Sequence, residues 1–270
     1  MAPRTVLITG STDGIGRQTA LELAGLGANV IVHGRDPERL KAAAGFIAES
    51  APDSRVDTIC ADLASFGAIR DMAARLRDRY GRIDVLINNA GVFEKYRQPT
   101  VDGFERTVAV NHLAPYLLTG LLLDKLLGSP DGRIVNVSSM VHAQSLDLEV
   151  FTGEKPYDGF EAYSQSKLCV ILFTYALADR LKATAVTVNC LHPGVINTKL
   201  LRQNWHGGSP VTDGAKTTVY LAVSPDVRNE SGRYFVNRKA VRSARATYDP
   251  EMQQKLWKIS EAWTGYEYRI

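Results

Sequence analysis

The stretch Thr5-Val-Leu-Ile-Thr-Gly-Ser-Thr-Asp-Gly-Ile-Gly16 joins a short apolar run to a glycine-rich turn, and the amphipathic segment Arg17–Ala24 follows it directly. Glycines at Gly10, Gly14 and Gly16 permit a tight turn, close approach of the backbone to a ligand, and close packing of a helix on a strand. The helix N-terminus then offers free N–H groups and a positive dipole to phosphates. An empty glycine-rich turn is the alternative, but the strand–turn–helix order favours a dinucleotide site.

The same alternation of short and long segments continues along the chain. Short β-branched runs predict strands at 5–9, 29–33, 55–59, 83–87, 132–137, 185–189 and 233–236. Amphipathic segments predict helices at 15–26, 37–49 and 66–80. Continuous apolar strands separated by helices are typical of a parallel sheet covered on both faces. We therefore predict an α/β fold over residues 1–270, a single doubly wound Rossmann-type domain with about seven mostly parallel strands flanked by helices.

Composition narrows the class of protein. The 270 residues are 45% apolar and 23% charged, which is ordinary for a globular domain, and the net charge of +3 is spread along the chain without a basic patch for nucleic acid. The longest nearly apolar run, Leu168–Ala178, is too short to span a bilayer, and Met1–Arg4 leaves no room for a signal peptide before the first predicted strand. Three distant cysteines and five histidines without paired ligand spacing favour reduced thiols and no metal site. We expect a cytoplasmic protein with neither a nucleic-acid nor a membrane partner.

Further motifs follow the glycine turn in a fixed order. They are Asn88-Asn89-Ala90-Gly91, Asn111, Ser138-Ser139, Tyr163-Ser-Gln-Ser-Lys167 and Pro193-Gly194 with Thr198. Together with the spacing Thr-Gly-x-x-x-Gly-Ile-Gly, they resemble the short-chain dehydrogenase/reductase family. The resemblance implies hydride transfer between a nicotinamide cofactor and a small-molecule carbonyl or alcohol substrate.

Tyr163 and Lys167 lie four residues apart, so a helix places them on one face. A free phenol has a pKa of about 10 and must shift towards neutrality to exchange protons readily. A nearby ammonium group, aided by an oxidised nicotinamide, favours the phenolate, and Lys167 is therefore expected to lower the pKa of Tyr163. The resemblance assigns Tyr163 as the acid/base and Lys167 as the group that tunes it and holds the cofactor ribose.

The resemblance also implies two supporting catalytic residues. A serine hydroxyl orients the substrate oxygen, and Asn111 organises a proton-relay water. Ser138 and Ser139 are adjacent; we choose Ser139 because the catalytic serine of the family usually lies one step beyond the strand. The long interval between Ser139 and Tyr163 includes the stretch 153–159 and resembles retinol-dehydrogenase-like and WW-domain-oxidoreductase-like members, here without a membrane anchor.

The choice of dinucleotide depends on the end of the second predicted strand. Asp36 lies 20 positions after Gly16, a spacing typical of the acidic residue that binds NAD ribose. However, Asp36-Pro37 is also typical of a helix start. By resemblance, Gly34-Arg35 suits NADP, because a guanidinium can pair with the 2′-phosphate. Asp13 gives no support, since many NADP-preferring relatives have Lys or Arg there.

We therefore favour NADP(H) over NAD(H), with Asp62 and Leu63 beside the adenine. The residues expected to contact the cofactor are Gly10, Ser11, Thr12, Asp13, Gly14, Ile15, Gly16, Arg35, Asp62, Leu63, Asn89, Ala90, Gly91, Tyr163, Lys167, Pro193, Gly194, Val195 and Thr198.

The C-terminal third is expected to build the substrate side. Residues 195–211, which include Trp205-His-Gly-Gly208, are interpreted as a lid with glycine hinges. Residues 249–263 predict an amphipathic helix that covers the cleft or meets another subunit. Core packing accounts for the run Leu168–Ala178, although family members often dimerise there, which leaves a homodimer or homotetramer open.

The leading hypothesis is an NADP(H)-dependent carbonyl reductase or alcohol dehydrogenase. Because a fold does not fix which bond accepts hydride, reduction of a C=N or C=C bond is an alternative. A non-catalytic NADP-sensing protein is a second alternative, against which the presence of Asn111, Ser139, Tyr163 and Lys167 argues.

Overall fold

A single mixed sheet organises the chain in the computed structural model, which describes residues 3–204 and 207–270. Its strands are β1 (Thr5–Ile8), β2 (Asn29–Gly34), β3 (Val56–Cys60), β4 (Val85–Asn88), β5 (Arg133–Val137), β6 (Thr187–His192), β7 (Arg233–Val236) and β8 (Lys239–Val241). The strand order is β3-β2-β1-β4-β5-β6-β7-β8, and every pair except β7–β8 is parallel. The chain thus starts in the middle of the sheet and winds out in both directions, which confirms the doubly wound fold.

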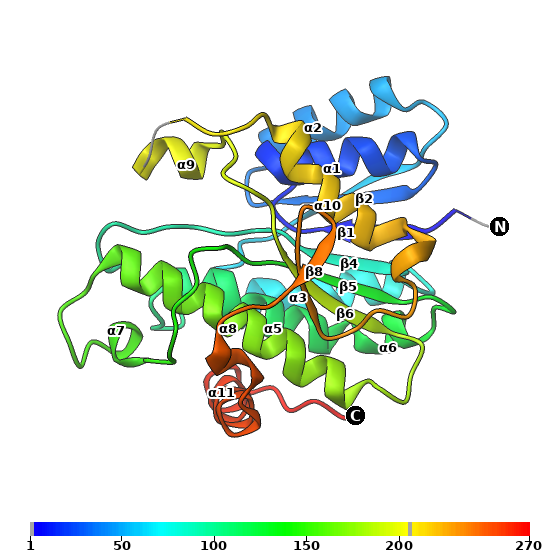
Figure 1. The fold of residues 1–270 in the computed structure, drawn as a ribbon. Coiled ribbons are helices and arrows are strands. Elements are labelled where there is room, and N and C mark those ends of the chain that lie inside the picture. The colour runs from blue at the N-terminus through cyan, green and yellow to red at the C-terminus, as the bar shows by residue number, and fades with distance from the viewer. Residues whose placement is uncertain (1–2, 205–206) are drawn as a thin grey trace.

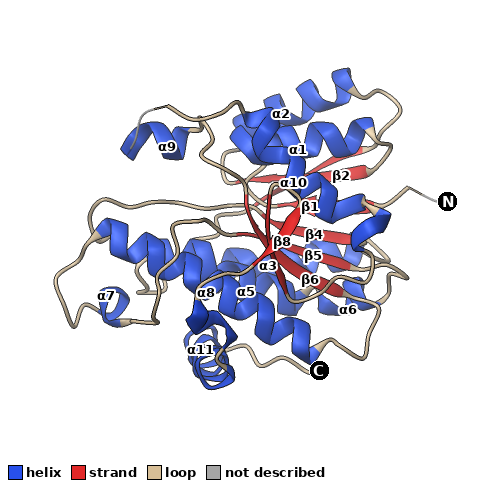
Figure 2. Cartoon of the chain, viewed as in Figure 1, coloured by secondary structure: helices blue, strands red, loops and turns tan. Residues whose placement is uncertain are grey.

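Helices cover both faces of the sheet (Figure 1). One face carries α1 (Gly14–Gly25), α2 (Pro37–Ser50) and α10 (Val211–Val223). The other carries α3 (Phe66–Arg79), α5 (Ala114–Leu121), α6 (Leu123–Leu127), α8 (Gly159–Arg180) and α11 (Pro250–Thr264). Shorter pieces are α4 (Arg106–Val108), the π-helical turn η1 (Ala109–Leu113), α7 (Glu149–Thr152), α9 (Lys199–Asn204) and the 3₁₀ turns η2 (Pro225–Val227) and η3 (Arg245–Tyr248). Figure 2 shows the strands as a layer between the two sets of helices.

The central strands are apolar on both faces because each face packs against helices. Leu7 and Leu86 belong to the cluster formed with α3, α5 and α8, whereas their neighbours Ile8 and Ile87 belong to the cluster formed with α1, α2 and α10. All four residues of β4 are buried. The continuous apolar runs in the sequence therefore reflect a sheet buried on both sides.

Two features of the C-terminal third complete the fold. The sequence predicts a strand at 233–236 but not the antiparallel strand β8, which follows it through Asn237 and Arg238, both at positive φ (49° and 63°). Every residue of the apolar run Leu168–Ala178 is buried within the chain, and α11 packs along α8. Core packing therefore accounts for that run.

The parallel strands bring the motif-bearing loops to one edge. The glycine turn follows β1, and the loops that contain Asn89, Ser139 and Pro193 follow β4, β5 and β6. Because parallel strands end at the same edge, these loops meet at the carboxyl side of the sheet, where ligands of open α/β sheets bind.

Candidate active site

The glycine turn is packed tightly against its neighbours. Gly10 lies at a φ of +62°, and its N–H donates to Nδ1 of His33 (3.0 Å). The side-chain amide of Asn89 donates to the carbonyls of Thr9 (2.9 Å) and Gly10 (3.1 Å). A Cβ on Gly16 would lie 2.3 Å from the Gly10 carbonyl oxygen. Only glycine therefore lets α1 begin against this turn, with its first N–H groups directed at the edge where a phosphate binds.

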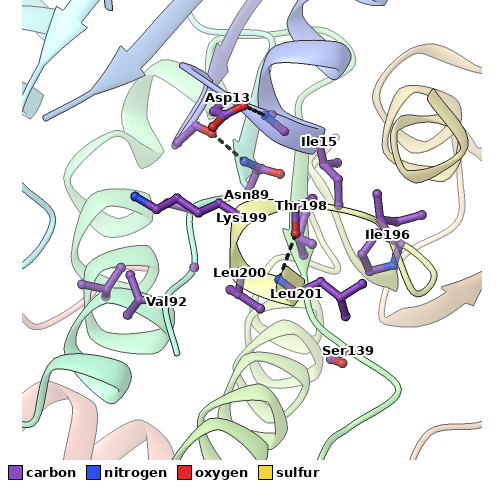
Figure 3. A pocket seen from close by; sticks show the side chains of 18 of the residues that line it. Asp13, Ile15, Asn89, Val92, Ser139, Ile196, Thr198, Lys199, Leu200 and Leu201 are labelled. Carbon is purple, nitrogen blue, oxygen red and sulfur yellow. Dashed lines mark hydrogen bonds between the residues drawn. The ribbon is translucent and has the colours of Figure 1, made fainter. Parts of the chain in front are cut away.

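A cleft of about 660 Å³ runs along this edge. The predicted site residues that line it are Gly10, Thr12, Asp13, Gly14, Ile15, Gly16, Arg35, Asp62, Leu63, Asn89, Ala90, Gly91, Ser139, Tyr163, Lys167, Pro193, Gly194, Val195 and Thr198. Figure 3 shows Asp13 and Ile15 towards one end, Ser139 towards the other, and Thr198 to Leu201 between them. The cleft is thus long enough to combine the glycine turn and the predicted catalytic residues in one site.

Two predicted site residues, Ser11 and Asn111, do not line the cleft. Ser11 is fully buried and its hydroxyl donates to the carbonyl of Ile8 (2.7 Å), so this member of the turn supports the fold beneath it. Asn111 lies in η1, where its side chain accepts from the Val92 N–H (2.8 Å) and donates to the Ser166 hydroxyl (2.9 Å). Its side chain therefore ties the loop after β4 to α8, and its proton-relay role stays a prediction.

Tyr163, Lys167 and Ser139 come together at the floor of the cleft. The Tyr163 hydroxyl lies close enough to the side chain of Ser139 for Ser139 to lower the pKa of the phenol. Lys167 follows one turn later on α8; its Nζ lies 5.5 Å from the centre of the Tyr163 ring and donates to the carbonyl of Val137 (3.0 Å). A phenol and a hydroxyl can therefore both contact one substrate oxygen at this point.

The acid–base balance of the pair differs from the expectation drawn from the sequence. Burial raises the pKa of Tyr163 to about 12, although the Ser139 side chain acts in the opposite direction. Burial also lowers the pKa of Lys167 to about 8. Lys167 is not among the groups that shift this pKa, because its amine is buried and directed at the Val137 carbonyl; the expected lowering by Lys167 together with an oxidised nicotinamide stays a prediction. Tyr163 is accordingly protonated at neutral pH.

The geometry favours Ser139 over Ser138. The Ser138 hydroxyl is buried and donates to the backbone carbonyl of Lys167 (2.9 Å). The Ser139 hydroxyl accepts from the Val141 N–H (3.0 Å) and meets Tyr163. Of the two adjacent hydroxyls, the one at position 139 faces the phenol.

Charged side chains mark the opposite end of the cleft. The carboxylate of Asp36 accepts from the N–H groups of Glu38 (3.0 Å) and Arg39 (3.2 Å), so Asp36 is the N-cap of α2. Arg39 forms an ion pair with Asp13 (3.1 Å) and lines the cleft, a contact that sequence reasoning missed. Arg35 also lines the cleft, and its guanidinium has no hydrogen bond or ion pair within residues 3–204 and 207–270.

Comparison with known proteins identifies the family. The sequence profile of the short chain dehydrogenases matches residues 4–207. The chain belongs to the short-chain dehydrogenase family. Human retinol dehydrogenase 13 is 40% identical to it, over 98% of this chain and 85% of that protein. The predicted likeness to retinol-dehydrogenase-like members of this oxidoreductase family is thereby confirmed.

Solved structures of the family give the same fold. An uncharacterised protein from Mycobacterium paratuberculosis superposes with a TM-score of 0.83 at 34% identity, over 99% of this chain and 95% of that one. A short chain dehydrogenase from Shigella flexneri, complexed with NADP, superposes with a TM-score of 0.73 at 27% identity, over 87% of this chain and 97% of that one. The short-chain dehydrogenase fold therefore extends beyond the segment that the profile matches.

In this short-chain dehydrogenase, an apolar wall beside Ser139 was not predicted from the sequence. It includes Val92, Met140, Leu200 and Leu201, which line the same cleft. The sequence could have indicated this wall, because these apolar residues closely follow the predicted motifs Asn88–Gly91, Ser138-Ser139 and Pro193–Thr198. An apolar wall thus stands in the same cleft as Ser139.

The segment predicted as a lid closes on itself. Its N-terminal part pairs with its C-terminal part, since the Ser209 N–H donates to the Val195 carbonyl (2.8 Å) and the Asn197 N–H to the Ser209 carbonyl (2.9 Å). Between them, α9 contributes Leu200 and Leu201 to the cleft. Trp205 and His206 lie outside the described residues, and the lid function stays a prediction.

Neither a metal-binding group nor a membrane-spanning helix is found in the described part of the chain. In the two ranges that the structure describes, no three His, Cys, Asp or Glu side chains are grouped so that they could hold a metal ion. Within those same ranges, no helix has the length and apolar character needed to cross a membrane.

Proposed function

We propose that the protein transfers a hydride between NADP(H) and a carbonyl or alcohol substrate, with Tyr163 as the acid/base. The observation that carries this proposal is that the side chains of Tyr163 and Ser139 lie together in the same cleft as the glycine turn. A bound nicotinamide supplies or accepts the hydride, and the protein supplies the proton at the substrate oxygen.

The residues divide this work according to their chemistry. With a pKa of about 12, the Tyr163 phenol keeps its proton at neutral pH and can donate it to an oxygen that gains negative charge during reduction. The Ser139 hydroxyl can hydrogen-bond the same oxygen and hold it against the phenol. Lys167, whose amine lies one helical turn away, is assigned to the cofactor ribose and to stabilising the phenolate that remains.

The experiment that tests this proposal replaces Tyr163 by phenylalanine. Turnover of ketones and aldehydes with NADPH should fall about 100- to 10,000-fold, because a positioned acid contributes that much, while NADPH affinity stays unchanged. Tyr157→Phe is the control, since the Tyr157 hydroxyl donates to the Glu94 carbonyl (3.0 Å) outside the cleft. Unchanged turnover in Tyr163→Phe, or wild-type turnover confined to imines or enones, contradicts the proposal.

The proposed preference for NADP rests on the charged end of the cleft. Among the described residues, the Arg35 guanidinium has no partner there, and Arg39 adds a second cation, which is paired with Asp13. A Cβ on Gly34 would lie 2.4 Å from Cγ2 of Thr12, which leaves no space for an acidic ribose-binding residue at the end of β2. The NADP bound to the Shigella flexneri relative also supports this choice.

Arg35→Ala tests the preference. Affinity for NADPH should fall about 10- to 100-fold more than affinity for NADH, since a hydrogen-bonded charge contributes about 1.5–3 kcal/mol. The melting shifts of the protein with each dinucleotide report this, because ligand at about 100 times its Kd stabilises by about 2.7 kcal/mol. Arg55→Ala, at the amino end of β3, is the control. Equal losses of both dinucleotides in Arg35→Ala remove Arg35 from the 2′-phosphate site.

A further inference from the structure

The backbone carbonyl of Ser139 is held from a part of the fold outside the nucleotide motifs. Two side chains converge on this one oxygen: the Tyr234 hydroxyl donates to it at 3.1 Å, and Nδ1 of His142 lies 2.8 Å away. Tyr234 belongs to β7, two strands away from β5, after which Ser139 lies. The loop that carries Ser139 is therefore hydrogen-bonded to β7, past the intervening strand β6.

His142 extends the same connection to the segment after β8. Its Nε2 accepts from the N–H of Ala244 (3.1 Å), so Nδ1 carries the ring proton and donates to Ser139. Its ring also packs edge-on against Tyr234, with centroids 5.5 Å apart. The two donors thus support each other as well as the carbonyl.

The Tyr234 hydroxyl is buried and donates its hydrogen bond to the Ser139 carbonyl. The side chain is buried in a small cluster with Ile171, Tyr175 and Cys190. Among the described residues, the Ser139 carbonyl is the hydrogen-bond partner of its hydroxyl. Burial also raises the pKa of Tyr234 well above the ordinary value, so the hydroxyl remains a donor.

Fixing the Ser139 backbone also fixes its hydroxyl. The hydroxyl accepts from the Val141 N–H and meets Tyr163, and both contacts depend on the orientation of the residue 139 peptide. A small misplacement of a positioned group is costly to a reaction, because the reacting atoms must lie within a few tenths of an ångström of the productive geometry.

We propose that Tyr234 and His142 are positioning residues that hold the Ser139 hydroxyl against Tyr163. Strand β7, through the Tyr234 hydroxyl, and the Ala244 N–H, through His142, thereby control proton transfer at the substrate oxygen. The inference rests on the function proposed above, in which Ser139 and Tyr163 contact that oxygen.

Tyr234→Phe tests the inference with a matched control, Tyr175→Phe. Both changes delete one buried hydroxyl from the same cluster, but the Tyr175 hydroxyl bonds to Ser243 (2.8 Å) and does not reach Ser139. Tyr234→Phe should lower kcat about tenfold with NADPH affinity unchanged, whereas Tyr175→Phe should leave kcat within about twofold of the wild type.

A second readout is the pH profile of alcohol oxidation. Since the Ser139 side chain lowers the pKa of Tyr163, a displaced Ser139 should shift the half-maximal rate to higher pH. The shift is expected in Tyr234→Phe and not in Tyr175→Phe. An unshifted profile with wild-type kcat in Tyr234→Phe overturns the inference, as does an equal loss in both variants.

The double variant separates this inference from the proposed function. If Tyr234 acts through Ser139, Tyr234→Phe should cost nothing further in a Ser139→Ala background. A further loss there shows a merely structural role and overturns the inference. Full turnover in Ser139→Ala alone overturns the proposed role of Ser139 itself, whereas a loss in Ser139→Ala with none in Tyr234→Phe overturns only the inference.

Discussion

At one end of the cleft, the glycine turn Gly10–Gly16 is a single continuous stretch of chain, whereas the contacts around Ser139 are assembled from distant segments. Tyr163 and Tyr234 reach Ser139 from a helix and a strand, and His142, itself held by the Ala244 N–H, reaches it from the loop after β5. The glycine turn is backbone packed closely on backbone, and the contacts around Ser139 are made largely by side chains. The glycine turn should therefore tolerate no added atom, while the surroundings of Ser139 can adjust.

Gly16→Ala is the strongest test of this difference. Its Cβ would meet the Gly10 carbonyl oxygen at 2.3 Å and the Asn89 amide nitrogen at 2.4 Å, and neither can move without opening the turn. We expect NADPH affinity to fall about 100-fold or more, and the free energy of unfolding to fall by about 1–3 kcal/mol. Titration of NADPH and urea unfolding measure the two effects.

Gly25→Ala is the control for that substitution, at the other end of the same helix. A Cβ there meets nothing within 4 Å. The variant should bind NADPH like the wild type. If Gly16→Ala also retains its affinity, the turn is not rigid and the comparison between the two ends fails.

His33 supplies a smaller, pH-dependent test of the nucleotide end. Burial lowers its pKa from 6.5 to about 4, so it is neutral when its Nδ1 accepts from the Gly10 N–H. Between pH 6.5 and pH 4 the unfolded chain binds a proton at His33 that the folded chain does not. The contribution of His33 to the free energy of unfolding therefore falls by about 1.4 kcal/mol per pH unit on acidification.

His33→Asn should reduce that slope, because an asparagine oxygen can accept from Gly10 without titrating. His112 and His192, whose pKa values burial lowers to about 3 and about 4, keep contributing in the variant. Urea unfolding at several pH values between 7.5 and 5 measures the difference. If the free energy of unfolding depends on pH equally in the variant and the wild type, His33 takes up a proton without opening the glycine turn.

The same contrast explains what the sequence could predict. The alternation of strands and helices, the glycine turn and the pairing of Tyr163 with Lys167 follow from local spacing, and the profile of the family covers these segments. The sequence could also have predicted Arg39 as a cleft residue, because Arg39 lies four residues after Arg35 in a helix whose start was predicted. Such features depend on residues close together in the chain.

The features that the sequence did not reveal depend on packing. β8 has three residues and exists because the Asn237–Arg238 turn returns the chain along β7. Ser11 was expected in the site with the rest of its motif, but its side chain points into the core. The rise of the Tyr163 pKa was not foreseen, because burial, which no spacing reveals, is its largest cause.

Gly120→Ala gives the smallest expected effect and the sharpest form of the comparison. Its Cβ would overlap the Tyr266 ring at 2.2 Å, as close as the overlap expected at Gly16. Here, however, the obstacle is a half-buried side chain in the C-terminal tail, which can turn aside. Alanine also favours the helix by about 1 kcal/mol over glycine. We therefore expect a melting temperature close to that of the wild type and unchanged NADPH affinity, both measured beside Gly16→Ala. A loss of NADPH affinity equal to that of Gly16→Ala would show that the C-terminal tail is coupled to the cleft. It would also show that an added Cβ costs as much against a side chain as against the backbone.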